Sequence, residues 1–355
     1  MRIAIVAPLV TAIREPQLGG SQSVVADLAT GLTGRGHDVE VFSAGGSRID
    51  GVHVVDTGID PSSLSSSLFR ADEIRPRTTP ASRRAFEAVY SLVRRDAYDI
   101  VHNHAFDAPA FELATDLDAP VVHTLHLGPD PEIASALAGV AGFARVVCVS
   151  EWLRGAWERT ATVHAVIRNG VPVDRIPWSD EAGPAALCAG RLSPEKGVAE
   201  AIEIAIAADR PIVVAGSDYD ADYAAALRRR YSARVDFVGA LPRPRLWDLM
   251  SRSCALLCPV AWDEPFGLTA AEAQAAGTPV VAFRRGALGE VVADGVTGAL
   301  VRDVPGATRA LAAVARFDRR ACRAHAQRAL SLDTMLDAHE ELYRRLVARV
   351  GTERP

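Results

Sequence analysis

The chain has 355 residues, a length that predicts two α/β domains, each large enough to bury its own core. Its hydrophobic fraction of 49% and charged fraction of 23% are typical of a globular protein and disfavour long disordered tails. The net charge of −5 disfavours a general nucleic-acid-binding protein, because such proteins normally carry a basic excess.

The sequence gives no sign of membrane insertion or secretion. No stretch approaches the roughly 18 consecutive apolar residues of a membrane span. Residues 2–8 read RIAIVAP, a buried strand that leaves no room for the basic region and cleavage site of a secretion signal. We therefore expect a cytoplasmic protein. Five cysteines without C-x-x-C spacing predict buried free thiols instead of a zinc site or disulfides.

Short apolar runs alternate with helical patterns along the whole chain. This alternation predicts strands that cross over through helices into parallel sheets, that is, an α/β fold. The strands expected in the first half are residues 2–8, 38–44, 52–58, 99–104, 121–126 and 145–150. Those expected in the second half are residues 185–191, 211–217, 235–240, 254–260 and 279–283.

A break in periodicity marks the domain boundary. Residues 167–184 contain Gly, Pro and acidic residues without a period, which predicts a linker between domains 1–168 and 169–332. From Asp333 to Val350 an amphipathic pattern predicts a last helix.

A glycine-containing loop follows the first strand. Gly19 and Gly20 precede a helix expected to start near Ser21, and such a loop lets the backbone approach an anion at the helix N-terminus. The full G-x-G-x-x-G pattern is absent, which disfavours a nicotinamide cofactor. The alternative is a glycine loop that only turns the chain.

The second half has a counterpart in AGRLSPEKG, residues 189–197. Ser193 and Pro194 predict a helix start at an N-cap and its first helical position. Lys196, the only lysine of the chain, would then lie in the first helical turn, where the helix dipole opposes a cation. Together with Arg191 it predicts a diphosphate site, because charge-assisted hydrogen bonds to phosphate offset that cost. The alternative is a pair of solvated surface cations.

Two carboxylates follow a later strand. Glu264 lies in the loop and Glu272 in the first turns of the next helix, where both are suited to accept hydrogen bonds from the hydroxyls of a polyol. For Glu272 there is a structural alternative, since Thr269 and Glu272 have the T-x-x-E spacing of a capping box.

Four histidines lie near strand ends, at positions 102, 104, 123 and 126. A metal site is one interpretation, but no cluster of acidic or cysteine ligands accompanies them. The sequence therefore predicts that these histidines do not bind a metal ion.

Taken together, several segments resemble the GT-B-fold retaining glycosyltransferases of family 4 (glycosyltransferase group 1). These are LGGSQSVVADLATGLTGRGHDVEVF, the RNGV linker, AGRLSPEKG, EPFGLTAAEAQAAGTPVVA and DGVTGALV. The resemblance implies two Rossmann-like, doubly wound parallel-sheet domains that face each other across a cleft. Residues 1–168 would form the acceptor domain, with the C-terminal helix 333–355 crossing back to it, and residues 169–332 would form the nucleotide-sugar donor domain.

The same resemblance implies roles for individual residues. Arg191 and Lys196 would hold the donor pyrophosphate, with Gly19 and Gly20 packed against it. Glu272 would bind the ribose hydroxyls, and Gly239 and Leu241 belong to the segment that cradles the base. Glu264 would hold a hydroxyl of the transferred sugar, helped by the backbone amides of Phe266, Gly267 and Leu268. His126, in the tripeptide Thr124-Leu125-His126, would contact the sugar; the alternative for His126 is a polar residue at a strand end.

The activity implied is transfer of a hexosyl group, with retention, from a UDP or GDP sugar to a hydroxyl acceptor, by a front-face mechanism without a metal or other cofactor. The acceptor would be a small molecule, a saccharide or a lipid-linked group. Residues 60–84 carry five arginines, which predict either a contact with a phosphorylated acceptor or membrane surface, or a solvated face. There are two alternative interpretations of the sequence: a nucleotide-sugar 2-epimerase and a non-catalytic nucleotide-sugar-binding protein.

Overall fold

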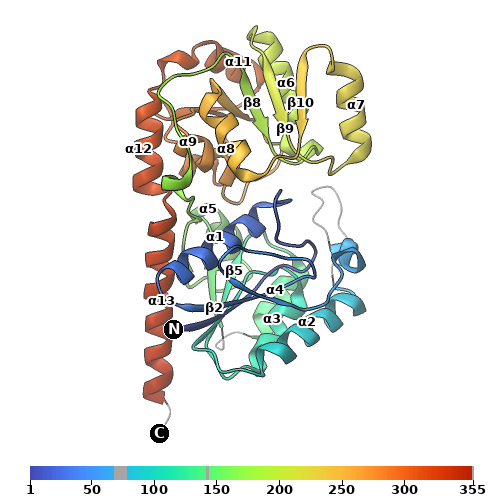
Figure 1. The fold of residues 1–355 in the computed structure, drawn as a ribbon, viewed down its shortest axis with the longest axis vertical. Helices are drawn as coiled ribbons and strands as arrows, with labels where there is room; N and C mark the ends of the chain where they lie inside the picture. The colour runs from blue at the N-terminus through green and yellow to red at the C-terminus, as the bar shows by residue number, and fades with distance from the viewer. Residues whose placement is uncertain (68–77, 141–143, 354–355) are drawn as a thin grey trace. The chain divides into compact units, whose positions relative to one another are not determined.

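The computed structural model describes residues 1–67, 78–140 and 144–353. The chain divides into two compact units, which we call unit 1 (Met1–Arg168 with Leu332–Pro355) and unit 2 (Asn169–Ser331). Each unit consists of a parallel sheet flanked by helices (Figure 1).

The sheet of unit 1 has seven strands in the order β3-β2-β1-β4-β5-β6-β7, and every neighbouring pair is parallel. The inner strands β1, β4 and β5 are buried on both faces, as is typical of parallel sheets. The strands are β1 (Arg2–Val6), β2 (Asp38–Ser43), β3 (His53–Asp56), β4 (Ile100–Asn103), β5 (Val121–Leu125), β6 (Ala144–Cys148) and β7 (Ala165–Val166).

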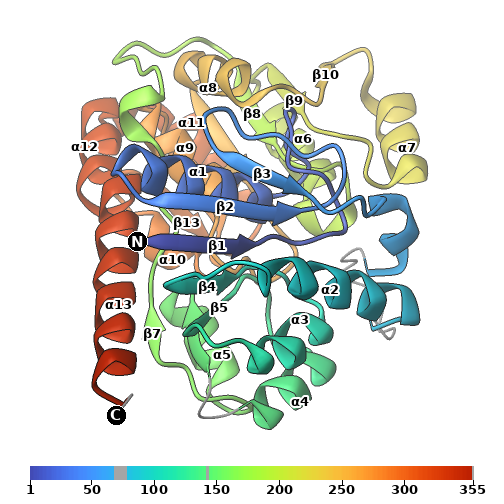
Figure 2. The same ribbon diagram turned by 60° about the horizontal axis from the view of Figure 1, so that its bottom comes forward.

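Helices connect these strands and cover the sheet (Figure 2). They are α1 (Gly20–Gly34), α2 (Pro80–Val93), α3 (Ala108–Glu112), α4 (Pro131–Gly139) and α5 (Glu151–Trp157), with short 3₁₀ turns η1 (Pro61–Ser67) and η2 (Leu113–Asp116). A capping box between Thr79 and Ser82 begins α2. The segment of residues 60–84 was predicted to contact an acceptor or a membrane through its arginines. Three of these, Arg70, Arg75 and Arg77, lie outside the described residues. Arg83 forms an ion pair with Glu112.

Unit 2 repeats the plan with six parallel strands in the order β10-β9-β8-β11-β12-β13. The strands are β8 (Ala186–Ala189), β9 (Ile212–Ala215), β10 (Val235–Gly239), β11 (Ala255–Cys258), β12 (Val280–Phe283) and β13 (Gly298–Val301).

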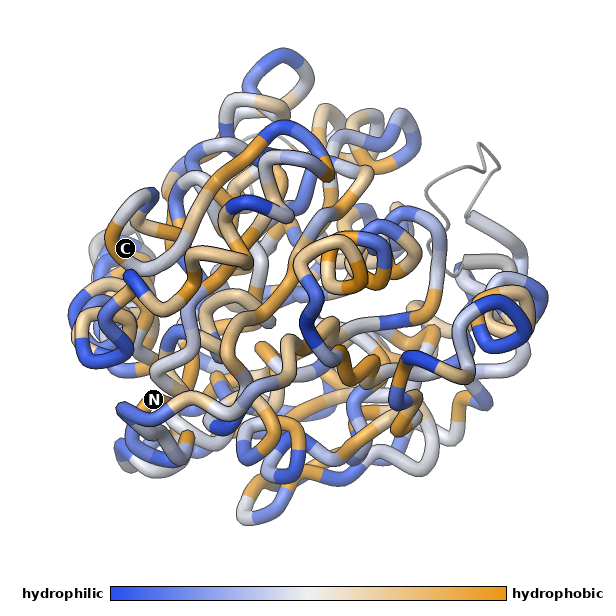
Figure 3. The backbone as a smooth tube through the Cα atoms, turned by 90° about the horizontal axis from the view of Figure 1, so that it is seen from above, coloured by the Kyte–Doolittle hydropathy of each residue, from blue (hydrophilic) through white to orange (hydrophobic). Residues whose placement is uncertain are grey.

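The helices of unit 2 pack around a core of small and β-branched side chains. They are α6 (Val198–Ala207), α7 (Ala221–Tyr231), α8 (Arg243–Arg252), α9 (Leu268–Ala275), α10 (Leu288–Val291), α11 (Val304–Ala312) and α12 (Arg319–Ala329), with 3₁₀ turns η3 (Val173–Arg175), η4 (Pro194–Lys196) and η5 (Val314–Arg316). Hydrophobic and hydrophilic segments both occur along helices at the edge of the view in Figure 3, as expected for amphipathic helices.

The last helix, α13 (Leu332–Glu353), belongs to unit 1 although it follows unit 2 in the sequence. Both ribbon views show it beside the end of α1 (Figures 1 and 2). The close approach needs a small residue, because a Cβ at Gly31 would lie 2.6 Å from Cδ1 of Leu336. Arg35, just after α1, adds ion pairs to Asp333, Asp337 and Glu340.

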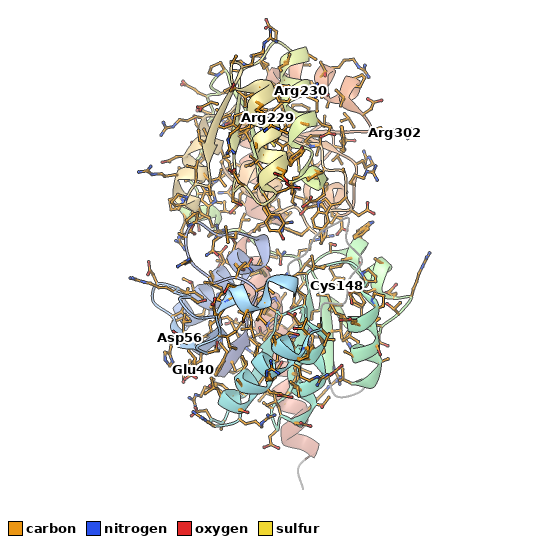
Figure 4. The ribbon with its side chains drawn as sticks, turned by 90° about the vertical axis from the view of Figure 1, so that its right-hand side faces the viewer. Glu40, Asp56, Cys148, Arg229, Arg230 and Arg302 are labelled. Carbon is orange, nitrogen blue, oxygen red and sulfur yellow. The ribbon has the colours of Figure 1, made fainter. Side chains whose placement is uncertain are left out.

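The cysteines are free thiols, four of them buried and Cys258 partly so. Cys148, labelled in Figure 4, ends β6. Burial raises the pKa of its thiol to about 12, so it stays protonated near neutral pH.

Candidate active site

Strand order places the candidate residues. In each sheet the order reverses between two central strands, β1 and β4 in unit 1 and β8 and β11 in unit 2. Ligands of such sheets bind beyond the carboxyl ends of the strands at this reversal. The loops after β1 and β4 carry Gly19 and His104, and those after β8 and β11 carry Lys196 and Glu264.

Lys196 and Glu264 form an ion pair, with Nζ 2.8 Å from Oε2. The Trp262 indole N–H donates to the same oxygen at 2.8 Å, and the Lys196 ammonium lies 4.6 Å from the Trp262 ring centroid. Trp262 therefore packs the loop. The Lys196 side chain is only 21% exposed, so the alternative of a solvated surface cation is wrong.

Arg191 is likewise engaged within its own loop. Its Nη2 lies 3.3 Å from Oε1 of Glu195, and its guanidinium stacks over Tyr219 with 4.2 Å between the carbon and the ring centroid. With 18% of its side chain exposed, Arg191 is not a solvated surface cation either.

The predicted helix start at Ser193 and Pro194 is wrong in detail. Residues Pro194–Lys196 form a 3₁₀ turn, Gly197 takes a left-handed conformation with φ 67°, and α6 begins only at Val198. The Ser193 hydroxyl donates to Glu195 at 2.7 Å instead of capping a helix. A Cβ at Gly197 would lie 2.0 Å from the carbonyl oxygen of Pro259, so the turn needs glycine here. Lys196 consequently precedes the helix and escapes the dipole cost expected for its first turn.

Backbone hydrogen bonds hold the loops of unit 2 together. The Ala261 N–H donates to the Glu195 carbonyl at 2.9 Å, which joins the loop after β11 to the loop after β8. The Ala287 N–H donates to the backbone carbonyl of Glu264 at 2.8 Å, so the loop after β12 holds the main chain at Glu264. Glu264 is thus held from two sides.

Glu272 is buried in α9 and is held by α8. Its Oε1 accepts from Nε and Nη2 of Arg243 at 3.1 and 3.0 Å and from Nε1 of Trp247 at 3.0 Å. The capping-box alternative for Glu272 is wrong, because α9 begins at Leu268 after Gly267 and has no side-chain cap. Its second oxygen, Oε2, accepts no hydrogen bond from any residue that the structure describes.

The remaining predicted residues of unit 2 lie at element ends. Phe266 is buried, Gly267 is the N-cap of α9 and Leu268 is its first residue. The first N–H groups of a helix have no intrahelical acceptor and are free for a ligand. Gly239 ends β10, where its carbonyl accepts from the Gly216 N–H at 2.9 Å, and Leu241 follows it, partly exposed.

In unit 1, Gly19 is the N-cap of α1 and Gly20 its first residue. Gly19 has extended backbone with φ −152°. A Cβ there would lie 2.6 Å from Oε1 of Gln22, the movable end of a side chain. Gln22 also bonds to Thr11 in the same loop.

The histidines divide between the two faces of the sheet of unit 1. His102, His104 and His126 are joined by hydrogen bonds on one face, with 2.9 Å between Nδ1 of His104 and Nε2 of His126. On the other face, His123 bonds to Asn103 at 3.0 Å. Burial lowers the pKa of His126 to about 4 and that of His123 to about 3, so both rings are neutral at pH 7.

Within the described residues, no group of three or more His, Cys, Asp and Glu side chains could hold a metal ion. Asp218 and Asp220, which flank Tyr219, are two carboxylates close in sequence, but each has a partner within the protein. Asp218 pairs with Arg228, and Asp220 caps α7. No helix in the part of the chain described here is long and apolar enough to span a bilayer.

Several side chains of the site escaped the sequence analysis. The side chain stacked on Arg191 is Tyr219, and those bonded to Glu272 are Arg243 and Trp247. Each lies 25 to 29 positions from its partner in the sequence. Tyr343 reaches the histidines from 241 positions away. The sequence does contain a signal for Arg243: it lies four residues before Trp247, so the two side chains share one face of a helix.

Two parallel-sheet units of this kind define the GT-B fold, and solved structures share it across the whole chain. A sucrose-phosphate synthase from Thermosynechococcus elongatus matches with a TM-score of 0.80 at 20% identity, covering 98% of this chain and 100% of that one. Anabaena Alr3699/HepE, solved in complex with UDP and glucose, matches with a TM-score of 0.73 at 19% identity, covering 96% of this chain and 99% of that one.

Sequence comparisons then give the family. Residues 18–175 match Glycosyltransferase Family 4, and residues 175–317 match Glycosyl transferases group 1. A glycogen synthase of Mycobacterium tuberculosis is 31% identical, over 95% of this chain and 93% of its own length. A D-inositol 3-phosphate glycosyltransferase of Mycobacterium avium is also 31% identical, over 99% of this chain and 96% of its own length. The chain belongs to the group 1, family 4 glycosyltransferases, as its sequence motifs predicted.

Proposed function

We propose that this glycosyltransferase transfers a hexosyl group, with retention, from a UDP or GDP sugar to a hydroxyl acceptor without a metal ion. The observation that carries the proposal is the ion pair of Lys196 and Glu264 beside the reversal of strand order in unit 2. It puts the only lysine of the chain next to a carboxylate suited to a sugar hydroxyl.

In this proposal Arg191 and Lys196 bind the donor diphosphate. The Lys196 ammonium has three N–H donors, so it keeps its hydrogen bond to Glu264 while two remain for phosphate oxygens. Stacking on Tyr219 fixes the plane of the Arg191 guanidinium, which lowers the entropy lost on binding. Two cations and the N-terminus of α9 would neutralise the charge that a metal neutralises in other transferases.

The proposed reaction takes place on one face of the sugar. The bond between C1 and the diphosphate oxygen breaks while the acceptor oxygen bonds to C1 from the same side. The acceptor proton passes to the leaving diphosphate, whose developing charge Arg191 and Lys196 stabilise. Glu264 and His126 would hold sugar hydroxyls during this step.

Glu272 is assigned to the ribose of the donor. Arg243 and Trp247 saturate Oε1 of Glu272, which leaves Oε2 with no partner among the described residues. An oxygen so oriented can accept from a ribose hydroxyl without rearrangement. Gly239 and Leu241 would border the base, and Gly19 and Gly20 would pack against the pyrophosphate.

For the acceptor, we propose a hydroxylated small molecule, saccharide or lipid-linked group. The named relatives suggest two probes, D-inositol 3-phosphate and glycogen. Phosphatidylinositol in vesicles serves as the probe for a lipid-linked acceptor. Arg83 and Arg84 at the start of α2 belong to the arginine-rich segment proposed to meet such an acceptor or a membrane surface.

The test follows donor sugars by NMR with EDTA present. A retaining transferase hydrolyses the donor slowly without acceptor and forms a product of unchanged anomeric configuration with one. A 2-epimerase would change the configuration at C2 without acceptor, and a non-catalytic binder would leave the donor intact. Turnover that requires added Mg²⁺, or a product of inverted configuration, would overturn the proposal.

A further inference from the structure

A continuous row of hydrogen bonds runs through the interior of unit 1. Its members are His126 after β5, His104 after β4, His102 on β4, and Tyr343 on α13. The ring nitrogens of His126 and His104 are 2.9 Å apart, and those of His104 and His102 are 3.2 Å apart. At the inner end, Nδ1 of His102 lies 2.6 Å from the Tyr343 hydroxyl.

The row is buried and carries no charge. His102, His104 and Tyr343 are fully buried, and His126 is 9% exposed. Burial holds the pKa of both His102 and His104 well below the usual range, and no carboxylate of the described residues pairs with any ring of the row. Each imidazole is therefore neutral and has one N–H and one bare nitrogen.

Neutral rings in a row allow two arrangements of protons, because each N–H must face a bare nitrogen. In the first arrangement, Tyr343 donates to Nδ1 of His102, His104 donates from Nε2 to the same atom, and His126 donates from Nε2 to His104. Nδ1 of His126 is then bare. In the second arrangement every proton is reversed, and Nδ1 of His126 carries the proton.

The inner partners decide between the two arrangements. Nε2 of His102 lies 2.7 Å from Oγ1 of Thr124, which accepts in the first arrangement and donates in the second. The second arrangement leaves the buried Tyr343 hydroxyl proton with no acceptor among the described residues. The first arrangement leaves only the Thr124 hydroxyl proton without an acceptor. This costs less, because an aliphatic hydroxyl is a weaker donor than the phenolic hydroxyl of Tyr343. The first arrangement is therefore favoured.

We propose that His104 is a positioning residue which, through His102 and Tyr343, fixes His126 as the Nε2–H tautomer. His126 has no hydrogen-bond partner other than His104 among the described residues, so its bare Nδ1 is left to accept from a ligand hydroxyl. The inference deepens the proposed function and depends on it for the sugar contact, but not for the tautomer. It also gives α13 a part in the site, because this C-terminal helix supplies the hydroxyl that orders the row.

The tautomer is measurable without substrate. In protein labelled with ¹⁵N in its histidine rings, the ring-nitrogen shifts distinguish a bare from a protonated nitrogen, and His126→Asn assigns the signal of His126. The expected result is a bare Nδ1 in the wild type. Tyr343→Phe removes the donor while keeping the ring, so Thr124 becomes the better donor and the tautomer of His126 switches. Thr124→Ser keeps the hydroxyl that accepts from His102, so it is the matched control and leaves the tautomer unchanged.

Kinetics separate this inference from the proposed function. Tyr343→Phe is expected to lower kcat by about fivefold with an unchanged donor KM, whereas Thr124→Ser leaves kcat nearly unchanged. A wild-type His126 protonated at Nδ1, or a tautomer unaffected by Tyr343→Phe, would overturn the inference whatever the activity. A switched tautomer with unchanged kcat would instead overturn the assignment of His126 to the sugar.

Discussion

Units 1 and 2 have the same order of central strands, yet the residues at the reversal of strand order differ in charge. In unit 1 they are buried, neutral imidazoles that bond to one another. In unit 2 they are arginine, lysine and glutamate joined in ion pairs. The shared topology determines where a ligand can bind, and the side chains determine the charge of the ligand group that suits each unit.

The largest expected difference between the units is their response to acid. The pKa of His126 is lowered to about 4, and those of His123 and His339 to about 3. A histidine with a folded pKa below its unfolded value near 6.5 contributes stability that is present above that pH and lost as the pH falls toward the folded value. Each contributes a loss of about 1.4 kcal/mol per pH unit.

Unit 1 should therefore open before unit 2 between pH 6.5 and 4, because unit 2 contains a single histidine, His325. Hydrogen exchange, corrected for intrinsic rates and followed peptide by peptide, measures the opening of each unit. His339→Leu should reduce the slope for unit 1, while His53→Leu on its exposed surface should not. Equal pH slopes in both units would contradict the comparison.

A second expected difference is in the free energy of unfolding that is lost when a charge is removed from a buried ion pair of unit 2 or from an exposed one. Glu272→Met leaves the Arg243 guanidinium buried without its carboxylate, which should lower the free energy of unfolding by about 3–5 kcal/mol. Glu341→Met removes the partner of Arg345 on the exposed face of α13 and should cost less than about 1 kcal/mol. Urea unfolding of both variants is the measurement, and equal midpoints would show that the Glu272 ion pair is not the buried contact described above.

Much of this arrangement was readable from the sequence, for reasons that differ between the elements. Each apolar run became a strand, because a parallel sheet covered on both faces needs such runs. The cations and carboxylates of unit 2 were predicted as site residues because loops after central strands carry ligand sites, and their role stays a prediction. The Arg243 to Glu272 ion pair and the Tyr343 contact were not, since the rotation of a helix about its axis depends on packing that no local pattern contains. The start of α6 was misplaced because Ser-Pro also begins 3₁₀ turns.

The single lysine tests whether unit 2 carries the charge of the donor. Lys196→Ala removes a charge-assisted phosphate contact and leaves Glu264 without its cation, so kcat/KM for the donor should fall by about 100-fold, or ~2.7 kcal/mol. Arg229→Ala on the exposed face of α7 (Figure 4) is the control and should change it by less than about twofold. Similar small effects at both positions would rule out the diphosphate site.

The smallest expected effect separates the two glutamates of unit 2 by the kinetic parameter that each one changes. Glu264→Gln keeps an oxygen that accepts from Lys196 and Trp262, so the fold should be nearly unaffected. Its proposed partner is the transferred sugar, where positive charge develops, so the loss of the carboxylate charge should lower kcat by about tenfold, ~1.4 kcal/mol, with little change in KM.

Glu272→Gln likewise retains an acceptor for Arg243 and Trp247, but its proposed partner is the ribose, which is bound equally in ground and transition states. Donor KM should therefore rise by about tenfold while kcat stays nearly constant. Unfolding midpoints measured beside the kinetics separate a lost contact from a lost fold. If Glu264→Gln raised KM and Glu272→Gln lowered kcat, the two carboxylates would have to exchange their places along the donor. If neither parameter moved in a folded, active enzyme, the charged site of unit 2 would serve the stability of its loops and not the donor.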